Sequence, residues 1–251
     1  MLQRVLAGGE KPGTEGSVHA AQSDKHVRAK GGAHPGTESS VPGLSRPGKG
    51  GHKVFSEIRI AGFGGQGVIL AAAVIGKAAA IFQGGYATMT QSFGPEARGG
   101  SSSAQVILSS EPILYPYLTR PDILVVMSQE AYTRFSPELK PDGILITEQD
   151  LVRVGQIPSG VKAYGVPATR LAEELGRKVV LNIVMVGFFG AAVKLLDPDA
   201  LRQAVADSVP PAMQKLNLQA FDKGFEYGKQ LMVQLAENGD SDSAVATLEG
   251  A

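Results

Sequence analysis

The sequence contains no cysteine, and its histidines are confined to one end of the chain. Without thiolates, the chain cannot ligate an iron–sulfur cluster through cysteine and has no thiol nucleophile. The four histidines all precede residue 54: His19, His26, His34 and His52. The rest of the chain therefore lacks the side chains of Ser–His–Asp hydrolysis and of ordinary zinc catalysis. We expect no catalytic residue and no metal site in this chain, and any difficult chemistry to reside on a cofactor or on another subunit.

Long apolar runs and an excess of one charge are also lacking. No apolar run reaches the length of a membrane span. The 24 basic residues are balanced by 24 acidic ones, so no overall charge attracts nucleic acid or an anionic membrane. A chain without cysteine also fits a cytoplasmic setting. We therefore expect a cytoplasmic protein with neither a nucleic-acid nor a membrane partner.

The two ends differ in composition from the rest of the chain. Residues 1–53 contain no aromatic residue and are dominated by Gly, Pro, Ser, His and charged residues. Such a segment cannot bury enough apolar surface to offset its ordering entropy, so we predict a disordered leader. Residues 237–251 carry four acidic residues and no basic one, which predicts a flexible acidic tail. The folded domain is then expected over residues 54–236.

Within this domain, hydrophobic patterning predicts strands that alternate with helices. Strands are expected over 57–62, 86–90, 103–108, 122–127, 143–147 and 161–165. Helices are expected over 67–82, 167–176, 181–196, 198–206 and 211–236. The run from Asp122 to Met127 is nearly continuous in apolar residues, as in parallel strands covered on both faces. These patterns predict a three-layer, Rossmann-like α/β domain with a mostly parallel sheet and a helical C-terminal part.

The most informative stretch is the glycine cluster that follows the first predicted strand. Gly62, Gly64 and Gly67 satisfy the G-x-G-x-x-G spacing, and an alanine-rich helix is predicted directly after them. Amides at such a helix start form an anion site, which favours a phosphate. The alternative is a tight glycine turn needed only for packing. An NAD site also requires an acidic residue about twenty positions on, and residues 84–91 contain none, so NAD is disfavoured.

A second glycine-containing stretch follows the second predicted strand and is expected to form a loop over 91–101. It reads Ser92-Phe93-Gly94-Pro95-Glu96-Ala97-Arg98-Gly99-Gly100. Together with Gly62-Phe63-Gly64-Gly65-Gln66-Gly67, it resembles the gamma subunit or domain of the 2-oxoacid:ferredoxin oxidoreductases. Three later pieces agree with that family: Pro121–Leu124, Leu181–Gly187 and Asn217–Gly224. The resemblance covers roughly residues 55–230, and the second loop is closer to the 2-oxoglutarate branch than to the pyruvate branch.

The resemblance implies a reaction and a set of partners. The family oxidises a 2-oxoacid with coenzyme A to an acyl-CoA, carbon dioxide and reduced ferredoxin. Thiamine diphosphate, magnesium and [4Fe-4S] clusters are then expected on the alpha and beta subunits, and ferredoxin is reached through the complex. This chain would bind none of these cofactors alone, would be inactive alone, and would help to position coenzyme A as co-substrate.

The resemblance also suggests which residues contact coenzyme A. The expected binding residues are Gly62, Gly64, Gly65, Gln66, Gly67, Thr90, Glu96, Arg98, Gly99 and Gly100. Gln66 favours a binding role because packing gives no evident reason for it, and Arg98 can clamp a phosphate or a carboxylate. The alternatives are a turn at a subunit interface for the glycines and an ion pair with Glu96 for Arg98. For these roles the two glycine segments must lie side by side.

Three other functions stay open at this point. The chain could be the gamma subunit of the pyruvate or branched-chain 2-oxoacid enzyme. It could be a free-standing nucleotide-binding regulatory module, which would bind a dinucleotide as a stable monomer. It could also be an assembly scaffold that never touches coenzyme A.

Overall fold

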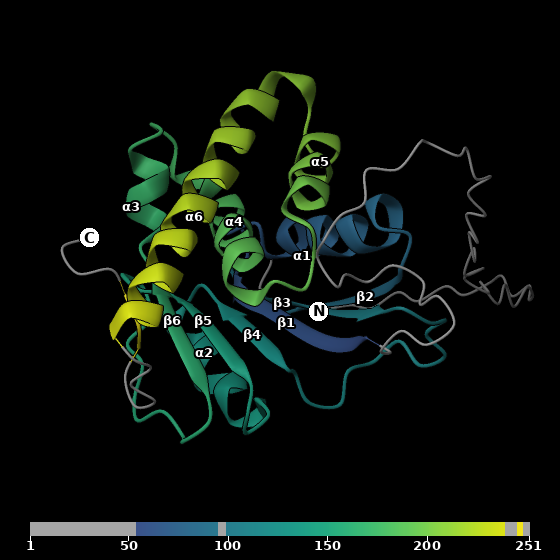
Figure 1. Cartoon of the computed structure of the whole chain (residues 1–251), viewed down its shortest axis with the longest axis vertical. Helices are drawn as coiled ribbons and strands as arrows, with labels where there is room; N and C mark the ends of the chain where they lie inside the picture. The colour runs from purple at the N-terminus through teal and green to yellow at the C-terminus, as the bar shows by residue number, and fades with distance from the viewer. Residues whose placement is uncertain (1–53, 95–98, 239–244, 248–251) are drawn as a thin grey trace, which may run out of the picture. The chain divides into compact units, whose positions relative to one another are not determined.

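The structure of the protein is a computed structural model, and it describes residues 54–94, 99–238 and 245–247. The described strands form one six-stranded sheet (Figure 1). In order across the sheet they are β2 (Tyr86–Phe93), β3 (Ser101–Ser109), β1 (Phe55–Phe63), β4 (Ile123–Val126), β5 (Ile144–Glu148) and β6 (Lys162–Val166). Strands β1, β4, β5 and β6 are parallel neighbours, whereas β3 runs antiparallel to both β1 and β2. The prediction of a mostly parallel sheet is confirmed.

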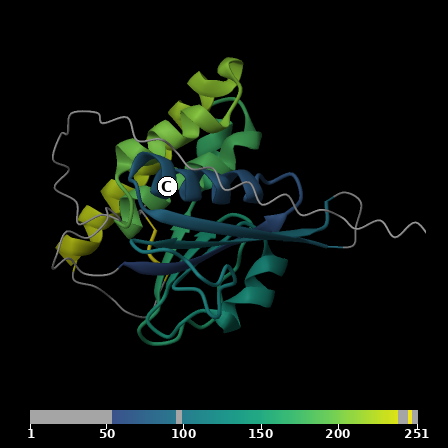
Figure 2. The same ribbon diagram turned by 90° about the vertical axis from the view of Figure 1, so that its right-hand side faces the viewer.

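Helices cover both faces of this sheet. They are α1 (Val68–Lys77), the π-helical η1 (Ala78–Phe82), α2 (Gln129–Phe135), η2 (Ser136–Glu138), α3 (Ala168–Glu173), η3 (Lys178–Val180), α4 (Leu181–Val193), α5 (Pro198–Ser208) and α6 (Pro211–Asn238). In Figure 2, α2 lies on one face and α1, α5 and α6 on the other. The larger hydrophobic cluster contains the buried residues of α1, α4, α5 and α6, and the smaller one contains those of α2. The predicted three-layer α/β architecture is confirmed.

Strand patterning explains how the sheet joins the two clusters. In β1, Ile58 and Ile60 face the larger cluster, whereas Ala61 belongs to the smaller one. In β4 every residue is buried, because the strand is covered on both faces. The continuous apolar run seen in the sequence therefore corresponds to the centre of the molecule.

Several element boundaries differ from the predicted ones. The expected loop over 91–101 is shorter, because β2 continues to Phe93 and β3 begins at Ser101. The expected helix over 67–82 changes from α-helix to π-helix after Lys77. Pro167 lies at the N-cap of α3 and not at its first helical position. Helix α2 was missed, because it has only seven residues and only Ala131 and Phe135 among them are buried.

Glycines bring α4 and α6 into backbone contact. A Cβ atom built on Gly224 of α6 would collide with the carbonyl oxygen of Val184 in α4. A Cβ atom on Gly187 of α4 would collide with the carbonyl oxygen of Phe221 in α6. Glycine at both positions therefore sets the distance between two helices that close the larger hydrophobic cluster.

A polar cluster holds the amino ends of β1 and β4. The ammonium of Lys140 donates to Glu57 Oε2 at 3.0 Å and to Asp122 Oδ1 at 2.7 Å. Burial lowers the pKa of Lys140, but the hydrogen bonds to Asp122 and Glu57 outweigh burial and raise that pKa above its ordinary value. Glu57 also accepts from the Thr119 amide at 2.7 Å. The cluster thus fixes the 110–122 connection at the end of the sheet remote from the glycine segment.

The C-terminal described residues lie along β6. Ala246 accepts a hydrogen bond from the Gly165 amide and donates one to the Ala163 carbonyl, both at 2.9 Å. This contact lies within the segment 237–251, for which the sequence predicts a flexible tail. The predicted leader, residues 1–53, lies outside the described residues. Among the helices that the structure describes, none has the length and apolarity to cross a membrane.

Candidate ligand-binding site

The glycine segment forms a turn that Gln66 closes from within. Gln66 Oε1 accepts from the Phe63 amide at 2.6 Å, and Gln66 Nε2 donates to the Met127 carbonyl at 2.7 Å. Gly65 and Gly67 have φ angles of 96° and 76°, a region that L-residues with side chains rarely adopt. The Gln66 side chain therefore ties the end of β1 to the end of β4. These contacts give Gln66 a structural role, for which the sequence alone offers no evident reason.

Helix α1 begins at this turn without a side-chain cap. Its N-cap residue is Gly67, whose carbonyl accepts from Asn182 Nδ2 at 3.2 Å and from the Ala71 amide at 3.0 Å. The first turn contains no acidic residue, so no carboxylate of that turn offsets the positive end of the helix dipole. Amides of a first helical turn lack partners within their helix and can bind an anion.

The two glycine segments lie side by side. The Gly64 amide donates to the Gly100 carbonyl at 2.7 Å, and Phe63 pairs with Ser101 where β1 meets β3. The juxtaposition expected from the sequence is thereby confirmed. Glu96 and Arg98 belong to residues 95–98, which lie outside the described residues.

The glycines of the first segment are not equivalent. A Cβ atom on Gly62 would meet Gln66 Oε1 at 2.5 Å, and one on Gly67 would collide with the Asn182 side chain. Gly65 needs its positive φ. A Cβ atom on Gly64, however, would only make ordinary contacts, the nearest being Gly100 O at 3.5 Å. Contacts and backbone angles of the described residues therefore require glycine at three of these positions but not at Gly64.

The turn lies where ligands bind in open α/β sheets. The chain leaves β1 for α1 on one face and leaves the neighbouring strand β4 for α2 on the other face. Such a switch in direction opens a crevice at the carboxyl ends of the two strands. The sequence could not reveal this point, because strand order is not encoded in local patterning.

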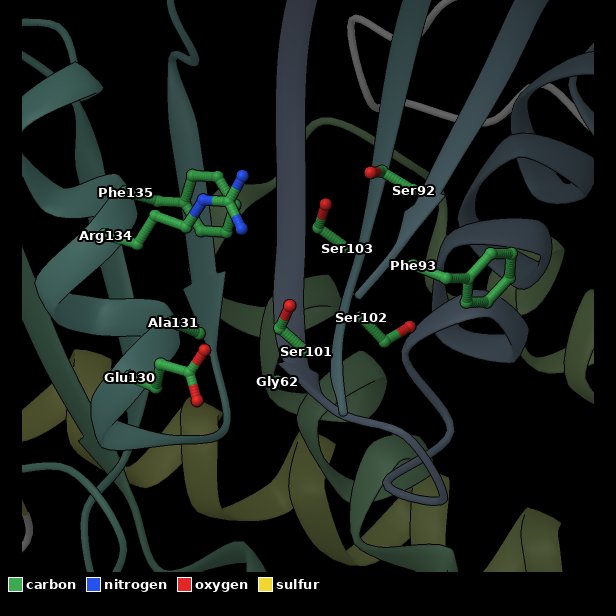
Figure 3. Close-up of a pocket in the computed structure, with 10 residues that line it drawn as sticks. All are labelled: Gly62, Ser92, Phe93, Ser101, Ser102, Ser103, Glu130, Ala131, Arg134 and Phe135. Atoms are coloured by element: carbon green, nitrogen blue, oxygen red, sulfur yellow. The ribbon is translucent and has the colours of Figure 1, made fainter. Parts of the chain in front are cut away.

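A small pocket opens beside this crevice, between α2 and the ends of β1, β2 and β3 (Figure 3). It is lined by Gly62, Ser92, Phe93, Ser101, Ser102, Ser103, Glu130, Ala131, Arg134 and Phe135. Of the expected binding residues that the structure describes, only Gly62 lines it. Thr90 lies farther back in β2, where its hydroxyl is 3.4 Å from Gln105 Oε1. The pocket adds Glu130 and Arg134, which sequence reasoning missed together with their helix.

Opposite charges from α2 face the serines across the pocket (Figure 3). The Arg134 guanidinium lies 5.0 Å from the centre of the Phe135 ring. Arg59 lies 4.4 Å from the same ring and pairs with Glu138. Burial lowers the pKa of Arg59, Glu138 opposes that shift, and the charge of Arg134 adds to it. Hydroxyls, amides and charges here can bind and orient a ligand, but the chain has no cysteine, and its histidines all precede residue 54.

Comparison with known proteins identifies the chain. The family described as "Pyruvate ferredoxin/flavodoxin oxidoreductase" matches residues 57–227. The chain belongs to this family. Its fold and relatives are those of the gamma-type subunits of 2-oxoacid:ferredoxin oxidoreductases, so the resemblance noted in the sequence is confirmed.

Among curated members of the family, the chain is similar to 2-oxoglutarate synthase subunits. It is 43% identical to subunit KorC of Methanocaldococcus jannaschii, over 71% of this chain and 97% of that protein. It is 47% identical to KorC of Methanothermobacter thermautotrophicus, over 69% of this chain and 95% of that protein. The chain is 32% identical to the pyruvate synthase subunit PorC of the same organism, over 71% of this chain and 99% of that protein.

Two solved structures of the family are similar. The gamma subunit of a keto/oxoacid ferredoxin oxidoreductase from Geobacter sulfurreducens aligns with a TM-score of 0.63 and 37% identity, over 69% of this chain and 95% of that one. The 2-oxoglutarate:ferredoxin oxidoreductase of Magnetococcus marinus was solved with 2-oxoglutarate, coenzyme A and succinyl-CoA bound. It aligns with a TM-score of 0.65 and 26% identity, over 78% of this chain but only 34% of that one. In the Magnetococcus protein, the matching domain is therefore part of a much longer chain.

Proposed function

We propose that this chain is the gamma subunit of an enzyme that converts 2-oxoglutarate, coenzyme A and oxidised ferredoxin to succinyl-CoA, carbon dioxide and reduced ferredoxin. Within that enzyme it helps to position coenzyme A and docks on the thiamine-binding subunits. The observation that carries the proposal is the hydrogen bond from Gly64 to Gly100, which joins the two glycine segments at the switch point of the sheet. Higher identity to KorC than to PorC favours 2-oxoglutarate.

The chemistry of the site fits the phosphates of coenzyme A. The start of α1 offers backbone amides and a helix dipole with no acid in its first turn. No contact among the described residues requires glycine at position 64, so close approach of another molecule explains Gly64 better than packing within this part of the chain does. Arg98, Glu96 and Thr90 stay in the proposal as contacts suggested by the sequence.

Partners hold the cofactors in this proposal. The chain has no cysteine, so cysteine-ligated [4Fe-4S] clusters belong to another subunit. Thiamine diphosphate and magnesium are placed on the alpha and beta subunits, and ferredoxin reacts with the complex. A cytoplasmic location completes the proposal.

Turnover by the purified complex tests the proposed substrate. We expect a kcat/KM for 2-oxoglutarate at least tenfold above those for pyruvate and for a branched-chain 2-oxoacid, with ferredoxin as acceptor. The isolated chain should show no turnover. A higher kcat/KM for pyruvate would instead identify the chain as the gamma subunit of a pyruvate enzyme. A chain that purifies alone as a stable monomer and binds a dinucleotide would instead support the regulatory module.

Substitution of Gly64 tests the coenzyme A contact separately from folding. In the assembled enzyme, Gly64→Ala should raise the KM for coenzyme A at least threefold, because the methyl group occupies the surface that the ligand approaches. The melting temperature should stay within about 1 °C, since the added Cβ makes only ordinary contacts. Gly76→Ala in α1 is the matched control, because its Cβ would contact only Ala87 and Val106, at 3.8 and 3.9 Å. An unchanged KM would leave these glycines with a packing role.

A further inference from the structure

The two edge strands of the sheet, β6 and β2, differ in whether another described segment pairs with their outer side. Along β6, residues 245–247 add backbone hydrogen bonds and cover part of the edge. Along the outer side of β2, no segment of the described chain makes such a contact. In Figure 1, β2 forms the end of the sheet opposite β6. One edge is therefore partly closed internally, and the other is open within the described residues.

The open edge carries none of the features that usually protect such strands. Strand β2 reads Tyr86-Ala87-Thr88-Met89-Thr90-Gln91-Ser92-Phe93, with no charged residue and no proline. It pairs with β3 residue by residue from Tyr86 to Phe93 and contains no bulge. Proteins normally blunt a free edge with lysines, prolines, bulges or short strands, because unpaired amides and carbonyls recruit other strands. An eight-residue regular edge of this kind is suited to pairing.

The hydrogen-bonding direction of each residue follows from the hairpin. The Gly94 amide donates to the Ser101 carbonyl at 2.7 Å, so alternate residues before Gly94 also face β3. The residues between them direct their amides and carbonyls away from β3. These outward-facing residues are Ala87, Met89, Gln91 and Phe93.

Side chains near this edge indicate the chemistry of the occupant. Met89 and Phe93 are 39% and 63% exposed. Ile81, in the neighbouring helix η1, is 64% exposed. Met89 lies opposite Val106, which packs into the larger cluster, so Met89 points to the helix α1 side of the sheet. The alternate residues Thr88, Thr90 and Ser92 lie on the other side of the sheet.

We infer that the edge of β2 is a docking site for an extended segment of a catalytic partner subunit, which adds a strand to this sheet. The segment is weakly charged and alternates apolar with polar residues, with its apolar side chains toward Ile81, Met89 and Phe93. An extended backbone is the ligand that satisfies outward amides and carbonyls spaced every second residue. This inference rests on the proposed function, because it assumes that the chain works within a larger enzyme.

A partner subunit is favoured over a second copy of this chain. In the Magnetococcus relative, the match covers only 34% of the chain, so other parts of that enzyme are covalently joined to the matching domain. The edge also ends at Phe93, beside the two glycine segments, so a strand docked there would place its subunit next to the proposed coenzyme A site.

Proline at position 89 tests the inference directly. Met89→Pro removes one outward amide but no hydrogen bond to β3, and proline is tolerated at such edge positions. With the partner subunits co-expressed, we expect Met89→Pro to weaken assembly at least tenfold, measured as the dissociation constant of this chain from the purified complex. A partner carbonyl then loses its donor while buried. Met89→Ala, which keeps the amide and loses only part of the apolar contact, should weaken assembly less than Met89→Pro does.

A second variant and two measurements separate the remaining outcomes. Met89→Lys keeps the amide and adds a charge, and it should also weaken assembly. Normal assembly of Met89→Pro and Met89→Lys, with wild type in the complex, would overturn the inference alone. Failure of wild type to join any thiamine-containing complex would overturn the proposed function.

Hydrogen exchange at residues 87, 89, 91 and 93 in the isolated chain should be fast. If these amides are slow, and become fast on deletion of residues 1–53 or on dilution, the edge is covered by the leader or by a second copy.

Discussion

Gly224→Ala is expected to lower the free energy of unfolding by about 3 kcal/mol, near the upper end of what overpacking usually costs. The new Cβ atom would collide with the carbonyl oxygen of Val184 and approach its carbonyl carbon to 2.8 Å. These are backbone atoms of α4, so no side-chain rotation relieves the collision, and α4 and α6 must separate. For a domain of this size, the corresponding fall in melting temperature is about 6–12 °C. Thermal unfolding followed by circular dichroism measures it.

Gly76→Ala serves as the control for this experiment. Gly76 is also helical, but a Cβ atom there would meet nothing closer than Ala87 Cβ at 3.8 Å. Alanine has a better helix propensity than glycine, so this variant should be stabilised by up to about 1 kcal/mol. If Gly224→Ala melted at the temperature of Gly76→Ala, helix packing through glycine would not set the distance between α4 and α6.

Gly67→Ala should be comparably severe, with a loss of about 3 kcal/mol. Two costs add up at this position. An alanine at φ 76° is strained by about 1–2 kcal/mol, and its Cβ would approach Asn182 Cγ to 2.5 Å. Asn182 is 2% exposed, so displacing its amide from the Gly67 carbonyl leaves a buried polar group without its partner, at about 1–3 kcal/mol. Chemical denaturation measures the total.

Two further variants divide this loss into its parts. Gly84→Ala places alanine at φ 69° with no atom of the described residues within 4 Å, so it should show the backbone strain alone, about 1–2 kcal/mol. The double substitution Gly67→Ala with Asn182→Ala removes the two closest contacts and leaves only the Asn182 Cβ position at 3.0 Å, so its loss should be smaller than the sum of the single losses. Additive losses would mean that Asn182 does not determine why position 67 must be glycine.

The sequence predicted the layers of the fold better than their arrangement. The apolar run before Met127 and the alternation of predicted strands with predicted helices were sufficient to predict the sheet and its coverage, because burial dictates these patterns. Strand order depends on contacts between distant segments, so the switch between β1 and β4 could not be derived. Helix α2 was missed for a local reason: it has only seven residues, although Ser128 caps its start by accepting from the Ala131 amide at 3.2 Å.

The same division applies to the site. That the two glycine segments would meet was predicted from the resemblance and is confirmed by the bond between Gly64 and Gly100. The role of Gln66 was not foreseen, because its partner at Met127 is 61 residues away. Glu130 and Arg134 were missed with their helix, since nothing in their spacing distinguishes them from an ordinary exposed pair.

The two hydrogen bonds of the Gln66 side chain affect the entropy change of any binding at this turn. Its two hydrogen bonds, with the bond between Gly64 and Gly100, fix the turn before any ligand arrives. A pre-organised loop loses little conformational entropy when it binds, so more of the contact energy appears as affinity. In the proposed coenzyme A contact, the entropic cost of ordering this turn would therefore fall in the folding step and not in the binding step.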